Sequence, residues 1–188
     1  KMFCPRGKML GGSSSHNGMV HVRGNSKDFD NWAQQGLTNW SYEKVLPYFK
    51  KSESIDGLDQ EYRNNSGPLK LSRSPNGNVL TQVYLDAAQQ AGYQINNDMN
   101  GKNQEGFGLM DTTIYKGKRQ STSVTYLHPI TQRTNLDVFT NVTVNKIIFE
   151  NKRATGVECK INGTTKKFFS SQEILLSAGA INSPQLLM

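Results

Sequence analysis

The stretch from residue 6 to residue 24 carries residue types from which a site for an anion or a polar ring could be built. It reads RGKMLGGSSSHNGMVHVRG. Adjacent glycines and three hydroxyl side chains in a row are followed by apolar residues at Met19, Val20 and Val22. Glycine lets the main chain approach a ligand closely and adopt positive φ, and successive N–H groups there can hold an anion. The sequence predicts a loop that holds a phosphate or polar ring and leads into a helix amino end.

The glycine spacing in this loop is neither GxGxxG nor that of Walker A, so those phosphate-binding motifs do not explain it. A second stretch has related features, since residues 173–180 read EILLSAGA, an apolar run typical of a strand buried on both faces of a parallel sheet. Asn182, Ser183 and Pro184 then start a helix, because proline is tolerated in the first turn. A strand, Ser-Ala-Gly and a helix amino end are again typical of an anion site.

The overall composition is that of a globular protein, with 188 residues, 35% of them apolar and 20% charged. The net charge of +7 permits an acidic partner, but the basic residues are interleaved with Asp and Glu. The longest basic cluster, residues 116–119, is interpreted as solvated surface, and no nucleic-acid partner is expected. No transmembrane segment is expected either, because no run of about 18 apolar residues is present.

The cysteine content and the two ends of the chain say little about where in the cell the protein is found. Cys4 and Cys159 form neither a disulfide framework nor a metal site, so no metal is expected. The first residues have no signal-peptide core, and the last residues stop inside an apolar run without a helix cap. A segment of a longer protein is therefore expected, and its localisation is left undetermined.

Helices are expected where apolar residues recur at helical spacing: residues 26–36, 42–51, 79–91 and 121–127. Ser26 and Ser41 are the expected N-caps of the first two, and Gly36 is the expected stop of the first. Pro47 predicts a kink or a break near Lys44 in the second.

Strands are expected mainly in the last third, in β-branched runs separated by turns: residues 136–140, 142–149, 154–161, 164–169 and the buried run 173–180. The dipeptide Asn162-Gly163 predicts a two-residue hairpin. Residues 53–78 are polar and rich in Gly, Pro and Asn, which predicts an exposed loop with a short strand at 68–72.

Ordered motifs along the chain resemble those of the glucose–methanol–choline (GMC) oxidoreductases. Residues 6–24, followed by Asp28 and Trp32, resemble the family's first signature, and residues 176–187 look like the opening of its second. Further similar motifs lie between them, at residues 40–42, 46–49, 106–108, 117–121, 126–129 and 133–136. Within the family, residues 106–129 are nearer to choline-dehydrogenase-like members than to sugar oxidases.

The resemblance implies an α/β fold, with helices and strands mixed as in α+β proteins. The chain would be a fragment of an FAD/NAD(P)-binding Rossmann-like domain together with part of the GMC substrate-binding domain. Residues 1–52 would be an FAD-binding segment with the flavin and pyrophosphate loop, and residues 53–115 a loop-rich part of the substrate domain or lid. Residues 116–188 would return to the FAD-binding domain with the adenine-side strands, the hairpin and the second-signature strand and helix.

The resemblance also implies that FAD is the cofactor. Cofactor-binding residues carried over from the family's motifs are Met9, Gly11, Gly12, Ser13, Ser14, His16, Asn17, Gly18, Met19, Val20, Val144, Ala178 and Gly179. Eight of these, namely Met9, Gly11, Gly12, Ser13, Asn17, Gly18, Met19 and Val20, would lie along the pyrophosphate and the isoalloxazine, and Val144 would meet the adenine through its main chain. Val144 is equally interpreted as a core strand residue, and both roles are compatible.

The activity implied is that of an FAD-dependent alcohol dehydrogenase or oxidase. It would transfer a hydride from the CH–OH group of a small alcohol to flavin N5, and that alcohol would be choline-like, a sugar or another primary alcohol. The family's GxGxxG and its C-terminal catalytic histidine are absent, so this chain alone is expected to be inactive and to hold no catalytic residue. His21 and His128 are expected to have structural or surface roles. The electron acceptor is undetermined, and a non-catalytic flavin-binding or structural homologue is the alternative.

His16 departs from most of the family, which has an aliphatic residue at this position. The choline-oxidase-like branch has a histidine in a similar Ser-Ser-His-Asn context, and that histidine carries the flavin covalently. A covalent bond would raise the redox potential of the flavin and retain it. The alternative is a histidine packed beside a noncovalent flavin.

Overall fold

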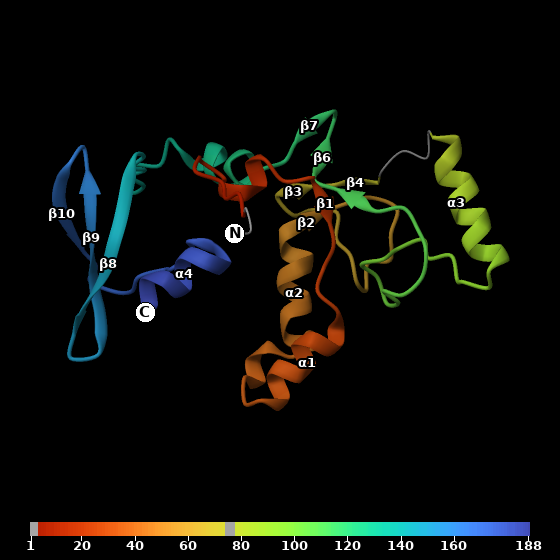
Figure 1. Ribbon diagram of the computed structural model, residues 1–188, viewed down its shortest axis with the longest axis horizontal. Coiled ribbons are helices and arrows are strands. Elements are labelled where there is room, and N and C mark those ends of the chain that lie inside the picture. The colour runs from red at the N-terminus through yellow and green to blue at the C-terminus, as the bar shows by residue number, and fades with distance from the viewer. Residues whose placement is uncertain (1–3, 74–77) are drawn as a thin grey trace. The chain divides into compact units, whose positions relative to one another are not determined.

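The computed structural model describes residues 4–73 and 78–188 (Figure 1). The chain divides into two compact units, unit 1 over Lys1–Arg133 and unit 2 over Thr134–Met188. Each unit mixes helices with strands, as the α/β prediction requires. The assignment of residues 1–52, 53–115 and 116–188 to functional domains stays a prediction.

Unit 1 contains short strands that pair in three small sheets. β1 (Val20–His21), β5 (Asp111–Thr112) and β4 (Ser72–Arg73) form one antiparallel sheet in the order β1-β5-β4. The other pairs are the parallel β2 (Glu53–Ser54) and β3 (Leu69–Lys70), and the hairpin of β6 (Ile114–Tyr115) and β7 (Lys118–Arg119). The short strand predicted at 68–72 is therefore present, as β3 and the first residue of β4.

The first two predicted helices are present as α1 (Ser26–Gln34) and α2 (Tyr42–Ser52). The N-cap of α1 is Asn25 and not Ser26, since the Asn25 side chain accepts a hydrogen bond from the Lys27 N–H. The break predicted near Lys44 is wrong, because α2 continues through Pro47. Tertiary packing outweighs the unfavourable propensity of proline here.

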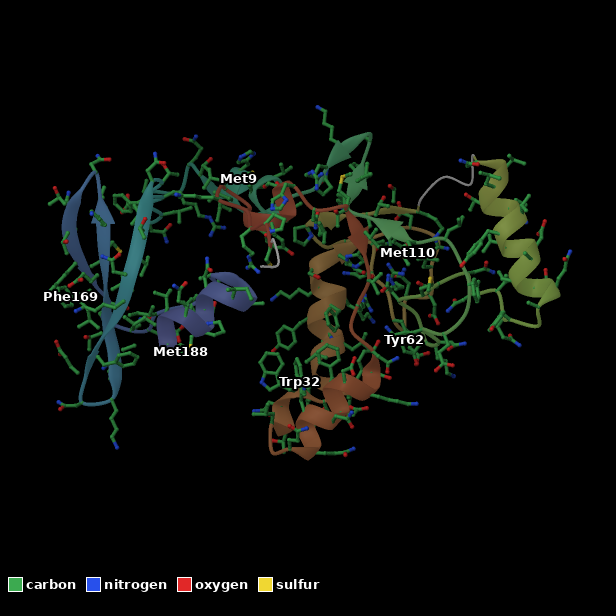
Figure 2. All side chains as sticks on the ribbon, in the orientation of Figure 1. Met9, Trp32, Tyr62, Met110, Phe169 and Met188 are labelled. Atoms are coloured by element: carbon green, nitrogen blue, oxygen red, sulfur yellow. The ribbon has the colours of Figure 1, made fainter. Side chains whose placement is uncertain are left out.

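That packing comes from aromatic rings shared between α1 and α2. The ring centroid of Phe29 lies 5.4 Å from that of Trp32 and 5.6 Å from that of Phe49, and Trp32 lies 6.1 Å from Trp40. Figure 2 labels Trp32 on α1. Edge-to-face pairs at these distances stabilise by about 0.5–1.5 kcal/mol beyond their buried area. The two helices are thereby fixed to each other.

The third and fourth predicted helices are also present. α3 (Val79–Gln90) has Asn78 as its N-cap, whose side chain accepts a hydrogen bond from the Leu80 N–H. The helix predicted at 121–127 is a π-helical turn, Ser123–Leu127, and His128–Ile130 follow in a 3₁₀ turn. The first of these turns ends before Pro129, as predicted.

Unit 2 is built on a three-stranded antiparallel meander. β8 (Val142–Glu150), β9 (Arg153–Ile161) and β10 (Thr164–Phe169) pair in the order β10-β9-β8. The predicted hairpin at Asn162-Gly163 is confirmed, with φ of 49° and 81° at its two residues. Positive φ at both positions is what a two-residue hairpin of matching twist requires.

Two strand predictions in unit 2 are wrong. Residues 136–140 form no strand, and the Phe139 ring instead packs on Phe168 of β10 at 5.4 Å. Residues 173–180 form no strand either, and Leu175 is 82% exposed. A parallel strand is stabilised by hydrogen-bonded neighbours on both sides, and none of the described segments pairs with this run.

The last helix, α4 (Gly179–Leu187), begins three residues before the predicted start at Asn182. The Ser183 hydroxyl accepts a hydrogen bond from the Ala178 N–H at 3.0 Å. This bond satisfies one of the amide groups that a helix start leaves without a partner. Ser183 and Pro184 therefore lie inside the helix and not at its start.

Candidate functional site

The predicted cofactor loop forms a compact turn in unit 1. Residues Gly12–Ser15 form a single 3₁₀ turn, and φ is positive at Gly11 (86°), Gly12 (53°) and Met19 (63°). The Ser14 hydroxyl donates to the Gly11 carbonyl at 2.5 Å, and the Ser15 hydroxyl donates to the Leu10 carbonyl at 2.8 Å. The Ser13 hydroxyl accepts a hydrogen bond from the Gly7 N–H at 3.2 Å, so all three hydroxyls stabilise the loop's own backbone, a role that the sequence pattern did not reveal.

One side of this loop is open. A Cβ atom added at Gly12 or Gly18 would meet no atom within 4 Å, and Ser13, His16 and Asn17 are exposed. Apolar side chains flank the opening, because Met9 is 56% and Val20 53% exposed (Met9 is labelled in Figure 2). Exposed apolar groups beside side-chain-free backbone suit a flat ring that carries polar edges.

A second segment of unit 1 supports the loop from its other side. The Thr122 N–H donates to the Ser14 hydroxyl at 3.0 Å, and the Thr122 hydroxyl donates to the Gly11 carbonyl at 3.3 Å. The Arg119 guanidinium donates to the Ser14 carbonyl and to two oxygens of Asn17. The interpretation of residues 116–119 as solvated surface is therefore wrong for Arg119, because spacing along the chain cannot show contacts across more than 100 residues.

The three histidines lie in different surroundings. His128 Nε2 is 3.2 Å from the Ser123 hydroxyl, which supports the structural role predicted for it. His21 Nε2 is 3.2 Å from Glu53 Oε2 in the interior of unit 1. His16 ends the 3₁₀ turn and is exposed at the open side of the loop.

A buried network of charges lies next to β1, immediately after the loop. The side chains of Glu53 and Arg63 are both 0% exposed, and Arg63 Nε is 2.8 Å from Glu53 Oε1. Arg63 also pairs with Asp98, and its NH2 is 2.8 Å from Asp111 Oδ2. Arg23 NH2 adds a contact of 2.7 Å to Glu53 Oε1. Positive and negative side chains alternate in this network, so the cost of burying each charge is offset by its partners.

The same network fixes the main chain that leaves the loop. The Arg23 N–H donates to Asn100 Oδ1 at 2.7 Å, and Asn100 Nδ2 donates to the His21 carbonyl at 3.1 Å. His21 is thereby held at two points: its carbonyl accepts from Asn100, and its ring contacts the Glu53 carboxylate. Because His21 follows Val20 directly, the network sets where the loop ends.

Sequence reasoning missed this network. Residues 53–78 were expected to be an exposed loop, and that is wrong for Glu53, Ile55, Arg63 and Leu71, all of which are buried. The segment is polar because it is held by ion pairs and hydrogen bonds and not because it is solvated. The only sequence signal for the network is the presence of charged residues in this segment. That signal is weak, since Asp98 and Asp111, the partners of Arg63, lie far away in the sequence.

Glu53 is the most perturbed carboxylate of the network. Burial by itself raises the pKa of Glu53, but hydrogen bonds from His21 and Arg63 and the charges of Arg23 and Arg63 lower it more, from 4.5 to about 2. The carboxylate is therefore ionised throughout the neutral and mildly acidic range. It acts as a fixed negative charge and not as a proton carrier.

Acid should destabilise unit 1 through Glu53. Because the folded pKa lies below the unfolded one, the stabilisation is complete above pH 4.5 and is lost as the pH falls towards 2. The loss from this group is at most about 3 kcal/mol. Urea unfolding between pH 6 and pH 2.5 measures it, with Glu53→Gln as the comparison. The variant is expected to be less stable at pH 6 and to have a flatter pH profile; an equally steep profile contradicts the assignment.

The three predicted cofactor contacts outside the loop all lie in unit 2. Val144 is in β8, opposite Cys159, and the register of the pair shifts directly after it. Ala178 and Gly179 start α4, with φ of 91° at Gly179. The structure brings the loop residues 9–20 together in one turn, whereas contacts of Val144, Ala178 and Gly179 with FAD stay predictions.

Two negative findings apply to the described residues. Within residues 4–73 and 78–188, no group of three or more His, Cys, Asp or Glu side chains is placed to hold a metal ion. None of the helices in these same ranges is both long enough and apolar enough to span a membrane.

Comparisons with known proteins match the whole chain. A family model described as GMC oxidoreductase matches residues 1–188. Human mitochondrial choline dehydrogenase is 48% identical over 187 residues, which is 100% of this chain and 32% of that protein. The oxygen-dependent choline dehydrogenase of Sinorhizobium medicae (strain WSM419) is 44% identical over 188 residues, which is 100% of this chain and 34% of that protein. The chain thus spans about a third of the length of these relatives.

Solved structures of two oxidoreductases have the same fold. Pyridoxine 4-oxidase from Mesorbium loti matches with a TM-score of 0.89 and 25% identity, over 97% of this chain and 36% of that one. An FAD-dependent oxidoreductase from Chaetomium thermophilum matches with a TM-score of 0.90 and 27% identity, over 97% of this chain and 34% of that one. The mixed helix and strand arrangement is therefore that of FAD-binding proteins.

Proposed function

Because the chain belongs to the GMC oxidoreductase family, as its motifs indicated, we propose that it is the cofactor-holding segment of an enzyme that oxidises a small choline-like alcohol. The relatives of highest identity given above are choline dehydrogenases, which favours choline or a similar primary alcohol over a sugar. The enzyme would be longer than this chain, because the chain spans about a third of those relatives. The segment alone would be inactive.

The observation that carries this proposal is the open side of the loop between Gly11 and Met19. The backbone is left-handed at both of these residues. No atom lies within 4 Å of a Cβ added at Gly12 or Gly18, so a flat ring could approach this surface. Thr122 supports the loop from the other side, so little conformational freedom would be lost when the ring binds. The loop fits FAD on these grounds.

Each residue of the loop would have a definite role towards FAD. Gly12 and Gly18 would let the main chain approach the ring, and Ser13 and Asn17 are exposed polar groups that could bond to its polar edges or to the diphosphate. Met9 and Val20 would cover the ring and exclude water from it. Bound FAD would supply the hydride acceptor, N5. The proton of the alcohol would be taken by a residue outside this chain.

The proposal is tested on the protein at the full length of its relatives. We expect the purified protein to show the visible absorption bands of flavin, and we expect choline added without oxygen to bleach them. Bleaching by another primary alcohol but not by choline would change the substrate and keep the reaction. Flavin bands that no alcohol bleaches would favour the non-catalytic homologue, and a protein that binds no FAD would contradict the proposal outright.

The same preparation decides how the flavin is attached. The exposed ring of His16 at the open side of the loop is accessible to a ring bound there. A covalent bond to His16 would keep flavin fluorescence with the protein band on a denaturing gel, and His16→Ala would release it. Fluorescence that migrates with free flavin in the unaltered protein would show noncovalent binding.

A further inference from the structure

Arg119 is the cationic side chain that lies against the predicted cofactor loop. It is in β7, and a single nitrogen, NH1, donates to the Asn17 carbonyl at 2.8 Å, to Asn17 Oδ1 at 2.8 Å and to the Ser14 carbonyl at 3.2 Å. Hydrogen bonds from an ionised donor are roughly twice as strong as neutral ones. Arg119 therefore holds two positions of the loop that are three residues apart.

The bond to Asn17 also affects Met19, the strained residue two positions later. Asn17 Oδ1 accepts a second hydrogen bond, from the Met19 N–H at 3.2 Å. Met19 has φ of 63°, a left-handed conformation that a long side chain adopts only when its surroundings impose it. The Thr113 N–H fixes the other side of Met19, donating to its carbonyl at 2.7 Å. Arg119 and Thr113 thus impose the turn from either side.

The charge of Arg119 is not neutralised inside unit 1. All of its hydrogen bonds in the described structure go to amide oxygens, and the ion pairs found among the described residues do not include it. Carbonyl oxygens satisfy the N–H groups but leave the full positive charge in place. A half-buried cation acts over several ångströms, because screening by water is incomplete there.

We propose that Arg119 is a positioning residue for the flavin, which sets the conformation of Asn17 and Met19 and places a positive charge behind the loop. This inference rests on the proposed function. Reduction adds negative charge to a flavin, so a nearby cation raises its reduction potential. Arg119 would therefore influence both how tightly FAD is held and how readily it accepts electrons.

The test compares Arg119→Ala with Lys118→Ala in the full-length protein loaded with FAD. Lys118 is the exposed neighbour in the same strand, so its removal takes away the same charge without touching the loop. We expect Arg119→Ala to raise the Kd for FAD by about 10- to 100-fold, the loss of one or two charge-assisted bonds. At saturating FAD it should also shift the flavin potential to more negative values. Lys118→Ala should change neither.

Arg119→Lys distinguishes positioning from general support. All three contacts come from NH1, which carries two N–H donors, and an ammonium group carries three, so lysine should restore part of the FAD affinity and most of the potential. A variant Arg119→Ala that lowers only the melting temperature, with potential and Kd unchanged, would overturn the inference and leave the proposed function standing. If the unaltered protein and Lys118→Ala both fail to bind FAD, the proposed function itself fails, and the inference fails with it.

Discussion

Replacing Arg63 with methionine is expected to lower the free energy of unfolding by about 3–5 kcal/mol, measured by urea unfolding of the full-length protein. Arg63 is 0% exposed and pairs with Glu53, Asp98 and Asp111. Those three carboxylates converge on one guanidinium, and its removal leaves them buried with too few cations. A buried charge without a partner costs far more than a lost surface contact.

The exposed ion pair in unit 2 provides the matched control. Lys146 Nζ lies 3.7 Å from Glu158 Oε2, and the Lys146 side chain is 64% exposed. Lys146→Met also removes one cation from one carboxylate, but we expect a change of at most about 1 kcal/mol. Equal losses in the two variants would mean that Arg63 is not buried among its partners as described.

Features that depend on neighbouring residues could be predicted from the sequence. The Asn162-Gly163 turn follows from the φ that its residues tolerate, and helices α1, α2 and α3 follow from apolar spacing and stops. The compact loop at residues 9–20 was predicted in the same way, because glycine and hydroxyl residues are adjacent in the chain, and its contact with FAD stays a prediction. Its family was confirmed by the comparison over residues 1–188.

Features that depend on distant partners could not be predicted. The Glu53–Arg63–Asp111 network joins residues up to 58 positions apart in sequence, from 53 to 111, and single charged residues in a polar loop look solvated. The strand prediction for residues 173–180 was wrong for the opposite reason. Their apolar pattern predicts a strand, but a strand also needs a hydrogen-bonded neighbouring strand. Arg119 is a further case of the first problem, because its acceptors are more than 100 residues away.

Gly11→Ala is expected to abolish measurable FAD binding by the full-length protein, seen as loss of the visible flavin bands after desalting. Gly11 has φ of 86°, and an added Cβ would lie 2.5 Å from the Ser15 hydroxyl oxygen and 3.2 Å from Ser123 Cβ. Either the backbone or both neighbours must move, and the loop would lose the support from the 119–123 segment. The expected cost of the left-handed backbone alone is about 1–2 kcal/mol.

Gly12→Ala separates the fold of the loop from its contact with FAD. Gly12 is also left-handed, at φ of 53°, but an added Cβ would meet no atom within 4 Å, and the same holds for Gly163 in the β9–β10 hairpin. Without FAD, Gly12→Ala and Gly163→Ala should therefore cost similar free energies of unfolding, about 1–2 kcal/mol each. With FAD they should differ, because only the methyl group at position 12 would occupy the side of the loop to which we assign the ring. Equal FAD affinities in these two variants would place the flavin elsewhere, whatever the result for Gly11→Ala.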